Sequence, residues 1–369
     1  MEGKIILNIF STVPTPHNNY FFSKIIESGS FELNLFYTTG SLKMYSWKKD
    51  YFEEFAEISK VTGKYKINPG IILRALKRKN EKYFFIGWPD ITTRILLLLF
   101  GLLKREFYYW SDLPGIEKKY SFVTRRVRNI FYNIVKNKAR KVFVVGEFAI
   151  PRFVEMGFRK ESLVNLPIFI EVPEVKAIEK DDVFGKFNID KEKLILISGS
   201  RLTKQKGYDK LLEAVSKLKT DTRKKIKLII VGTGEEKENL LNQTAELGIG
   251  DAVIFLDWME SEEFAYLISK SYAYIHPALY DAFGGGTLIA MAYGIPVIGS
   301  DGSGVVRERV KNKINGLVYN CSDSDELAGN IEYLIENKNA AEQMGINARR
   351  TAEEWQPGKG VEILIRNLN

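Results

Sequence analysis

Residues 277–287 read Pro-Ala-Leu-Tyr-Asp-Ala-Phe-Gly-Gly-Gly-Thr and follow the short apolar run Ala273–Ile275. Three consecutive glycines, Gly284–Gly286, stand at the start of the apolar stretch Gly286–Ala292. They predict a helix start whose first backbone N–H groups are free. Such a helix start favours an anion, because its N–H groups and its dipole both point toward the bound charge. Asp281 precedes the glycines and is a candidate acceptor for sugar hydroxyls. The plainer alternative is an acidic residue in a flexible turn.

Strands and helices alternate on both sides of this segment. The predicted strands of the second half are Leu194–Ser198, Lys227–Val231, Val253–Leu256, Ala273–Ile275 and Pro296–Ile298. The helical patterns between them are Asp209–Leu218, Glu235–Leu247, Ser261–Ser269 and Gly286–Ala292. The first half has strands at Lys4–Phe10, Glu32–Tyr37, Tyr83–Ile86, Glu106–Trp110 and Lys141–Val145, with helices at Asp90–Leu103 and Tyr120–Asn137. This alternation predicts parallel sheets with right-handed crossovers, and therefore an α/β protein with two Rossmann-like doubly wound domains.

The length of 369 residues also suits two domains. A charged, Pro-containing stretch at 171–190 predicts the linker, so residues 1–170 form the first domain and residues 171–356 the second. After the break at Trp355-Gln356-Pro357, the amphipathic segment Gly358–Leu368 predicts a helix that packs back on the first domain. We therefore assign residues 357–369 to the first domain.

Two further strand ends of the second half predict contacts with phosphate, because ligands of open α/β sheets bind beyond the carboxyl ends of the strands. In the first, Gly199 allows a tight exit, and Arg201 and Lys206 place two cations in one loop. Arg binds a diphosphate bidentately and Lys binds it as a point charge. A basic surface loop is the alternative. In the second, Gly232 and Gly234 let a ligand approach the backbone, although the same pair also fits a plain tight turn.

The net charge of +8 is distributed unevenly. Residues 1–168 have 28 Lys or Arg and 15 Asp or Glu, a net charge of +13, while the remainder is acidic. The basic clusters are Arg74-Lys77-Arg78-Lys79, Arg125-Arg126-Arg128 and Lys136-Lys138-Arg140-Lys141. Nucleic acid, an anionic membrane surface and a phosphorylated acceptor all fit this asymmetry, and an ordinary Lys-rich surface is the alternative.

The single cysteine, Cys321, excludes an internal disulfide and a Cys-based metal cluster, which indicates a reducing compartment. The start, MEGKIILNIF, resembles a buried strand rather than a secretory signal. The apolar run Ile95–Leu103 is shorter than the roughly 20 residues that a membrane span needs. It predicts a buried core helix, with a shallow membrane-contacting helix as the alternative. We expect a cytoplasmic protein, with a peripheral position on the inner face of the membrane as a further option.

Several segments together resemble the donor domain of the retaining glycosyltransferases of family four, which have the two-Rossmann-domain GT-B fold with a cleft between the domains. The matching segments cover most of residues 194–320 in the family's order. They read GSRLTKQKGYDKLLEAV, LIIVGTGEEKENL, VIFLDWM, IHPALYDAFGGGTLIAMAYGIPVIGSDGSGVVRERV and NGLVY. The first domain matches only in outline, around VVGEFAIPRFVEMGF.

The resemblance implies roles for individual residues. Arg201 and Lys206 would neutralise the donor's diphosphate, and Asp281 stands where the family has the first Glu of a paired-Glu motif that contacts the donor sugar. Trp258 and Met259 fall where the nucleobase usually lies. The remaining donor-binding candidates are Gly199, Gly232, Gly234, Phe283, Gly284, Gly285, Gly286 and Thr287. The family works without a metal or other cofactor, and Asp323-Ser324-Asp325 predicts a helix cap rather than a metal motif.

One departure from the family pattern concerns the ribose. The family's second Glu holds the ribose hydroxyls, and its place here is taken by Ile289, which cannot accept a hydrogen bond. Three interpretations follow: a thymidine diphosphate donor without a 2′-hydroxyl, another residue that reaches the ribose, or a catalytically weakened relative. The donor is therefore a UDP-sugar or another nucleoside diphosphate sugar, including dTDP-sugars.

The acceptor side has fewer signals. Thr12–Tyr20 follows the first strand and predicts a polar turn facing the cleft, with His17, Asn18 and Asn19 as candidates to contact phosphate or acceptor. A turn or helix-cap role is the alternative. Asp112 ends another strand and is a candidate to orient the acceptor hydroxyl or the donor sugar, whereas His276 predicts a structural role.

The sequence predicts transfer of a sugar from a nucleoside diphosphate to a hydroxyl of a glycan or lipid-linked acceptor, in cell-surface polysaccharide or glycolipid synthesis. The resemblance implies retention of configuration by a front-face mechanism. One rival is a non-catalytic nucleotide-sugar-binding protein, motivated by Ile289. The other is a basic nucleic-acid-binding protein, which explains the charge but lacks any reader motif. We expect no nucleic-acid partner.

Overall fold

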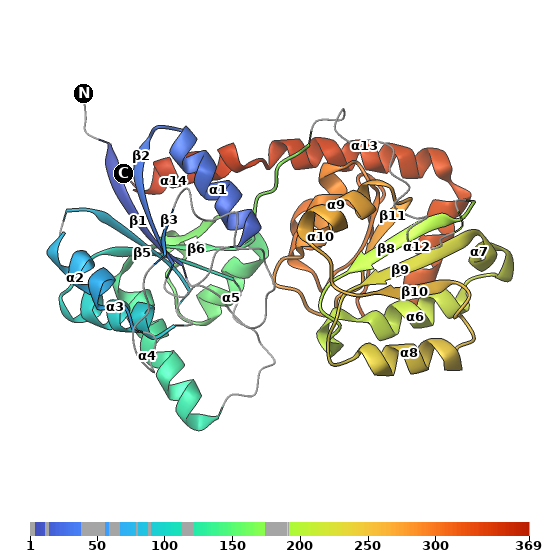
Figure 1. The fold of residues 1–369 in the computed structure, drawn as a ribbon, viewed down its shortest axis with the longest axis horizontal. Helices are drawn as coiled ribbons and strands as arrows, with labels where there is room; N and C mark the ends of the chain where they lie inside the picture. Colours follow the sequence, from blue (N-terminus) through green and yellow to red (C-terminus); the bar gives the residue numbers. More distant parts are fainter. Residues whose placement is uncertain are drawn as a thin grey trace. The chain divides into compact units, whose positions relative to one another are not determined.

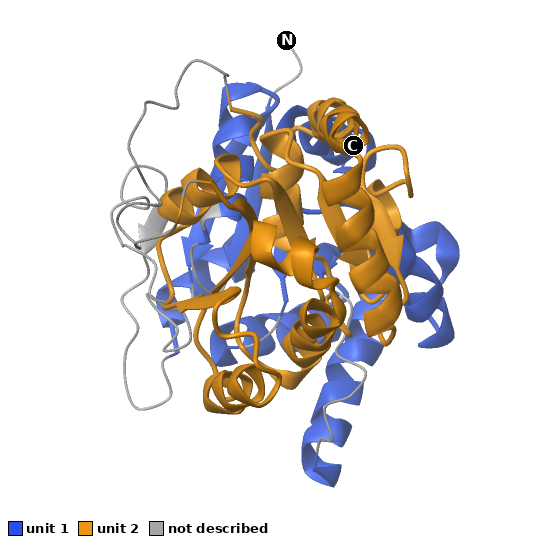
Figure 2. Cartoon of the chain, turned by 90° about the vertical axis from the view of Figure 1, so that its right-hand side faces the viewer, with its two compact units in different colours: residues 1–169, 357–369 blue, residues 170–356 orange. Residues whose placement is uncertain are grey.

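The structure, a computed structural model, describes residues 4–11, 15–37, 56–58, 67–78, 80–87, 90–112, 121–173, 190 and 192–368. It divides into two compact units, residues 1–169 with 357–369 and residues 170–356 (Figure 2). Residues 174–189 of the predicted linker lie outside the described ranges.

Unit 1 contains a parallel sheet of seven strands in the order β3-β2-β1-β4-β5-β6-β7 (Figure 1). The strands are β1 (Ile5–Ser11), β2 (Phe31–Tyr37), β3 (Ala56–Ile58), β4 (Lys82–Ile86), β5 (Phe107–Ser111), β6 (Ala139–Val144) and β7 (Leu163–Asn165). The five strands predicted in this half are confirmed within one or two residues, because each is a run of buried apolar and aromatic side chains. The chain winds outward from β1 in both directions, as a doubly wound sheet requires.

The helices of unit 1 begin at recognisable caps. They are α1 (Pro16–Glu27), α2 (Pro69–Lys77), α3 (Ile91–Leu102), α4 (Phe122–Lys138) and α5 (Ile150–Glu155), with short 3-10 turns at Glu147–Ala149 and Lys160–Ser162. The side chains of Thr15, Asn68, Asp90 and Ser121 each accept a hydrogen bond from a backbone N–H of the first helical turn. These caps satisfy N–H groups that the helix itself leaves unpaired.

The apolar run in α3 forms a core helix. Leu96, Leu97 and Phe100 are completely buried, and Gly101 lets α3 approach Ile134 of α4 closely. The predicted core role is therefore confirmed. No helix in the described part of the chain is both long and apolar enough to cross a bilayer.

The last helix, α14 (Pro357–Leu368), belongs to unit 1 although it follows unit 2 in the sequence. It packs beside α1, and Gly360 lies so close to Phe21 and Phe169 that a Cβ there would fall within 2.6 Å of both rings. The Tyr108 hydroxyl donates a hydrogen bond of 3.4 Å to the carbonyl of Leu368. The predicted return of this helix to the first domain is confirmed.

Unit 2 contains a parallel sheet of six strands in the order β10-β9-β8-β11-β12-β13. The strands are β8 (Leu194–Gly199), β9 (Ile226–Val231), β10 (Val253–Leu256), β11 (Ala273–His276), β12 (Val297–Ser300) and β13 (Leu317–Tyr319). All five strands predicted in this half are present within two residues. The strands β9 and β10 are added on one side of β8, and β11 to β13 are added on its other side. This change in the order of strands makes the carboxyl edge between β8 and β11 the switch point where ligands of such sheets bind.

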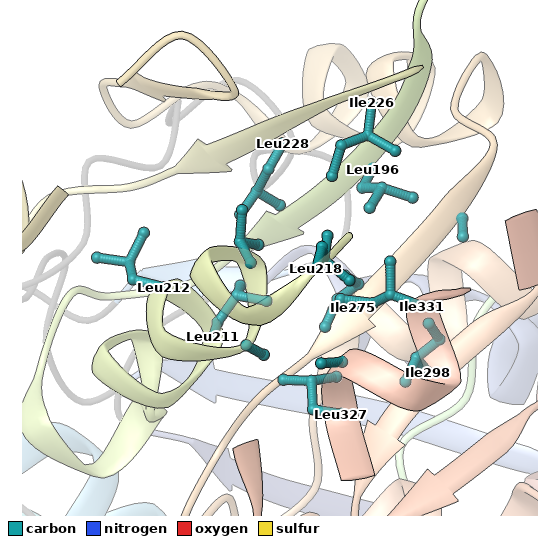
Figure 3. Close-up of a cluster of buried hydrophobic side chains, with 14 of the residues drawn as sticks. Leu196, Leu211, Leu212, Leu218, Ile226, Leu228, Ile275, Ile298, Leu327 and Ile331 are labelled. Carbon is teal, nitrogen blue, oxygen red and sulfur yellow. The ribbon is translucent and has the colours of Figure 1, made fainter. Parts of the chain in front are cut away.

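The helices of unit 2 cover both faces of its sheet (Figure 1). They are α6 (Tyr208–Lys217), α7 (Thr220–Lys225), α8 (Lys237–Glu246), α9 (Ser261–Ser269), α10 (Gly285–Ala292), α11 (Gly304–Arg309), α12 (Ser324–Glu336) and α13 (Lys338–Glu354), with a 3-10 turn at Lys204–Lys206. Figure 3 shows the core under α6 and α12, where Leu211 and Leu327 meet Ile275 and Ile298 of the sheet. Asp323 caps α12 as predicted. This α/β architecture confirms the predicted fold class.

Candidate donor site

The three predicted loops of unit 2 lie together at the carboxyl edge of its sheet. They follow β8, β9 and β11, and these strands are neighbours in the order β9-β8-β11. The Tyr280 N–H donates a hydrogen bond of 3.1 Å to the Gln205 carbonyl, and the Leu202 N–H donates one of 2.9 Å to the Thr233 carbonyl. The loops therefore support one another through backbone hydrogen bonds.

Glycines are required where these loops touch. A Cβ on Gly207, which has φ +65°, would lie 2.1 Å from the Pro277 carbonyl oxygen. A Cβ on Gly232 or Gly234 would lie 2.0 Å from the Ser200 oxygen or 2.2 Å from the Leu202 oxygen. No side chain fits at such distances, so these three positions require glycine for the loops to pack against one another. The loops packed in this way form a platform at the carboxyl edge of the sheet.

A buried ion pair links the first loop to the third. Lys206 Nζ lies 2.5 Å from Asp281 Oδ2, and each side chain is only 15% exposed. His276 Nε2 lies 3.2 Å from the same oxygen. Burial alone would raise the pKa of Asp281, but His276 and the charge of Lys206 outweigh burial and hold that pKa well below its usual range. Asp281 is therefore ionised at neutral pH.

Arg201 extends from the same loop into solvent. Within the described ranges it makes no ion pair, unlike Lys204, which lies 3.0 Å from Asp209. Lys206 donates one of its three N–H groups to Asp281, which leaves others for an anion. The loop thus presents the exposed guanidinium of Arg201 and the ammonium of Lys206, which Asp281 holds in place, at the switch point.

Helix α10 starts at the same place. Gly284 has φ +110°, and a Cβ there would crowd Ser303, Val305 and His276. Among the described residues, nothing accepts a hydrogen bond from the backbone N–H of Gly285 or Gly286. Nothing lies within 4 Å of a Cβ built on Gly285. Free N–H groups beside open space at a helix start are a geometry that suits an anion.

The neighbouring candidates Gly286, Phe283 and Thr287 pack against other residues around this helix start. A Cβ on Gly286 would lie 2.1 Å from the Tyr274 hydroxyl, so this glycine is needed for packing. Phe283 is buried, with the Arg309 guanidinium 5.2 Å from its ring centre. Thr287 is completely buried and its N–H donates to the Gly284 carbonyl at 3.2 Å. These side chains shape the site without reaching into it.

The remaining donor-side candidates lie further along the edge. Gly199 closes β8, where a Cβ would lie 2.4 Å from the ring of Phe264. Trp258 and Met259 lie in the loop after β10, the edge strand, and Trp258 is 43% exposed. Ile289 is half-buried and lies one helical turn after Gly285, on the same side of α10. This position presents an apolar side chain where the family resemblance places a carboxylate.

The acceptor-side candidates of unit 1 follow β1 and β5. Thr12–Pro14 lie outside the described residues, and Thr15–Tyr20 form the cap and first turn of α1 rather than a turn. His17 Nε2 lies 3.3 Å from the Thr15 hydroxyl, and burial lowers the pKa of His17 to about 4. The side chain of Asn18 is buried, and Asn19 accepts a hydrogen bond from the Tyr37 hydroxyl at the end of β2. Asp112 is exposed directly after β5.

Sequence reasoning missed the contact of His276 with Asp281. The signal was available, because one of only two histidines lies at the end of a predicted strand, five residues before Asp281. In the described part of the chain, no group of three or more His, Cys, Asp and Glu side chains is arranged to hold a metal ion.

The chain is similar to known proteins in sequence and in fold. Residues 179–351 match the family model described as glycosyl transferases group 1. This region, just under half of the chain, is similar to that family. It is 31% identical over 165 residues to an uncharacterized glycosyltransferase, MJ1607, of Methanocaldococcus jannaschii, an alignment that covers 45% of this chain and 41% of that protein. It is 24% identical over 184 residues to the lipopolysaccharide core biosynthesis glycosyltransferase LpsE of Rhizobium meliloti, covering 50% of each.

The fold of the chain resembles solved structures over its whole length. Anabaena HepE, solved with UDP, superposes with a TM-score of 0.77 at 17% identity, covering 99% of both chains. The same protein has been solved with UDP-glucose. At this identity the likeness establishes the two-domain GT-B fold. The chain spans about half the length of the curated relatives it matches.

Proposed function

We propose that the protein transfers a sugar from a nucleoside diphosphate sugar to a hydroxyl group, with retention of anomeric configuration. The observation that supports this most directly is the convergence of Arg201, Lys206 and the free N–H groups of Gly285 and Gly286 at the switch point of the unit 2 sheet. Two cations and a helix start suit two phosphates. Asp281, held ionised, is available as an acceptor for sugar hydroxyls.

The proposed reaction balances without a dedicated base. The bond between the anomeric carbon and the diphosphate oxygen breaks, a bond forms from that carbon to the acceptor oxygen on the same face, and the leaving phosphate takes the acceptor's proton. Arg201 and Lys206 stabilise the negative charge that develops on the phosphate. In this proposal no metal or other cofactor takes part.

The acceptor is proposed to be a glycan or a lipid-linked sugar in the synthesis of cell-surface polysaccharide or glycolipid. Support comes from LpsE, a relative named for lipopolysaccharide core synthesis, and from the positive charge of the first 168 residues, which suits a phosphorylated or lipid-linked acceptor. The donor is proposed to be a UDP-sugar or another nucleoside diphosphate sugar. UDP-glucose bound to HepE supports the first choice.

A thermal-shift screen with UDP-, GDP-, ADP- and dTDP-sugars tests the donor. A ligand at about 100 times its Kd adds about 2.7 kcal/mol to the free energy of unfolding, which raises the melting temperature by several degrees. The stabilising donor is then incubated with candidate acceptors, and NMR of the product reports the anomeric configuration. Stabilisation by none of the four classes would contradict the proposal. Stabilisation without transfer to any acceptor would support a non-catalytic nucleotide-sugar-binding protein.

A further inference from the structure

The first half of helix α4 extends beyond the rest of unit 1 (Figure 1). From Ser121 to Ile130 every residue except Arg128 is exposed, whereas Phe131 and Val135, further along the same helix, are buried against the unit. A helix of a globular protein usually buries its apolar side chains along its whole length. The first three turns of α4 therefore need a separate explanation.

The exposed half of α4 has an apolar face. Val123 is 69% exposed and Ile130 is 52% exposed, and Val127 lies between them on the same face, at spacings of four and three residues. Phe122, 60% exposed, stands at the start of the helix. Single exposed apolar residues are common, but four within three helical turns indicate a contact surface.

Positive charge surrounds this face. Between Ser121 and Lys141 the sequence has seven Lys or Arg and no Asp or Glu. The guanidinium groups of Arg125 and Arg126 lie 6.0 and 4.7 Å from the ring centre of Phe122. Neither makes an ion pair with any residue that the structure describes. Their charge is therefore available to an anionic partner.

We propose that the first half of α4 docks on an anionic lipid bilayer, with Phe122, Val123, Val127 and Ile130 in the interface and Arg125 and Arg126 at the lipid phosphates. An amphipathic helix with apolar side chains on one face and basic ones beside them binds such a surface without spanning it. This inference goes beyond sugar transfer and does not depend on it.

The combination of charges and apolar groups selects this partner over two others. A second copy of the chain would place seven like charges opposite seven, which opposes association. A nucleic acid would pair with the arginines but would leave Val123 and Ile130 in water. An anionic bilayer satisfies both sets of side chains at once.

Co-sedimentation of the full chain with vesicles tests the proposal. The probes are vesicles of phosphatidylcholine alone and vesicles with about 30% phosphatidylglycerol, at 0.1 M salt, where charges about 10 Å apart still interact. R125E/R126E replaces two positive charges with two negative ones, and V123S/I130S removes the apolar contact. The matched controls in unit 2 are K224E/K225E, an adjacent exposed lysine pair, and L241S/I346S, two exposed apolar helix residues.

We expect tight binding only to the anionic vesicles. R125E/R126E and V123S/I130S should each lower the partition coefficient at least about tenfold, while both control variants stay within about twofold of the unmodified chain. Thermal melting shows whether each variant is folded. Because the readout is sedimentation, its result is separate from that of the donor screen.

Three outcomes would overturn the proposal. The first is absence of binding to either vesicle, and the second is binding that the two control variants lower as much as the α4 variants do. The third is a dimer in light scattering that V123S/I130S separates into monomers without vesicles present, since α4 would then be an interface between copies of this chain.

Discussion

The strand ends after β8 and β11 of unit 2 differ in charge from the strand end after β1 of unit 1. After β8 and β11 of unit 2, Lys206 and Asp281 form a buried ion pair, and the pKa of Asp281 is lowered so that the carboxylate stays ionised. After β1 of unit 1, burial lowers the pKa of His17 to about 4, so that the imidazole stays neutral. Asn19 nearby accepts a hydrogen bond from the Tyr37 hydroxyl. The strand ends after β8 and β11 of unit 2 thus carry charged groups, whereas the strand end after β1 of unit 1 has neutral hydrogen-bonding groups.

This difference in charge fits the proposal that unit 2 binds the donor and unit 1 binds the acceptor. A diphosphate carries charge that must be neutralised, so the donor side needs fixed cations and free N–H groups at a helix start. A hydroxyl acceptor carries no charge at the reacting atom, and neutral amide and imidazole groups can orient it. Substitutions test this contrast at five positions, which are Lys206, Gly207, His17, Asp281 and Ile289 in order of decreasing expected effect.

Lys206→Ala should have the largest effect on activity. Removing the held ammonium takes away a cation aimed at the leaving diphosphate, and kcat/KM for sugar transfer should fall by about 10²–10³. Lys204→Ala is the control, because Lys204 lies in the same loop but is exposed and paired with Asp209. It should change kcat/KM by less than about threefold. Equal losses in the two variants would show that the loop's overall charge matters, and not the position of Lys206.

Gly207→Ala tests the platform of loops in unit 2. The new Cβ would combine an unfavourable left-handed backbone with a clash against Pro277, and the free energy of unfolding should fall by about 3 kcal/mol. Gly248→Ala is matched in backbone, since φ is +62° there and nothing lies within 4 Å of a Cβ. Its loss should be about 1 kcal/mol. Urea unfolding measures both variants, and similar losses would mean that the loops do not rely on their close contact.

The sequence predicts the strands of unit 2 but not the packing between its loops. Strands such as Val253–Leu256 and Ala273–His276 were predictable within a residue, because a buried parallel strand is a short continuous apolar run. The glycines at 207, 232 and 234 were visible as turn residues, but their backbone contacts join loops far apart in the sequence. Only the fold shows that these glycines are fixed by loop packing.

The same limit applies to the site. Arg201, Lys206 and Asp281 were identifiable because each follows a predicted strand, and the carboxyl ends of parallel strands meet at one edge. The pairing of Lys206 with Asp281 was not predictable, since it depends on side-chain positions 75 residues apart. In unit 1 the stretch after β1 predicted a turn, and the cap at Thr15 begins a helix there instead.

His17→Gln tests the neutral side of the comparison. The unfolded chain takes up a proton on His17 near pH 6.5, whereas the folded chain does so near pH 4. The free energy of unfolding of the unmodified chain should therefore fall as the pH drops through this window, by about 2 kcal/mol more than in His17→Gln. Urea unfolding at pH 6.5 and at pH 4.5 measures the difference.

Asp281→Asn is the matched contrast in unit 2. A carboxyl whose folded pKa is lowered contributes stability that is fully present above the unfolded pKa, near 4, and lost only below it. With His276→Gln as the common background, so that the neighbouring imidazole is absent from both proteins, the stability difference that Asp281→Asn causes should therefore stay constant between pH 7 and pH 5. A pH slope in this window for Asp281→Asn, or none for His17→Gln, would remove the electrostatic contrast between the units.

The smallest expected effect concerns Ile289 and the ribose. An apolar side chain on α10 offers no acceptor to the 2′-hydroxyl, so UDP and dTDP should bind with Kd values within about threefold of each other. Ile289→Glu adds an acceptor on the side of α10 that also presents Gly285, and should shift the preference toward UDP by about tenfold, the effect of one hydrogen bond of about 1.4 kcal/mol. Calorimetry with both nucleotides, and with Ile289→Gln as an uncharged control, measures the preference. If the unmodified chain already binds UDP far more tightly than dTDP, the expectation is wrong. A residue other than Ile289 then holds the ribose, and unit 2 recognises the nucleoside as well as the diphosphate.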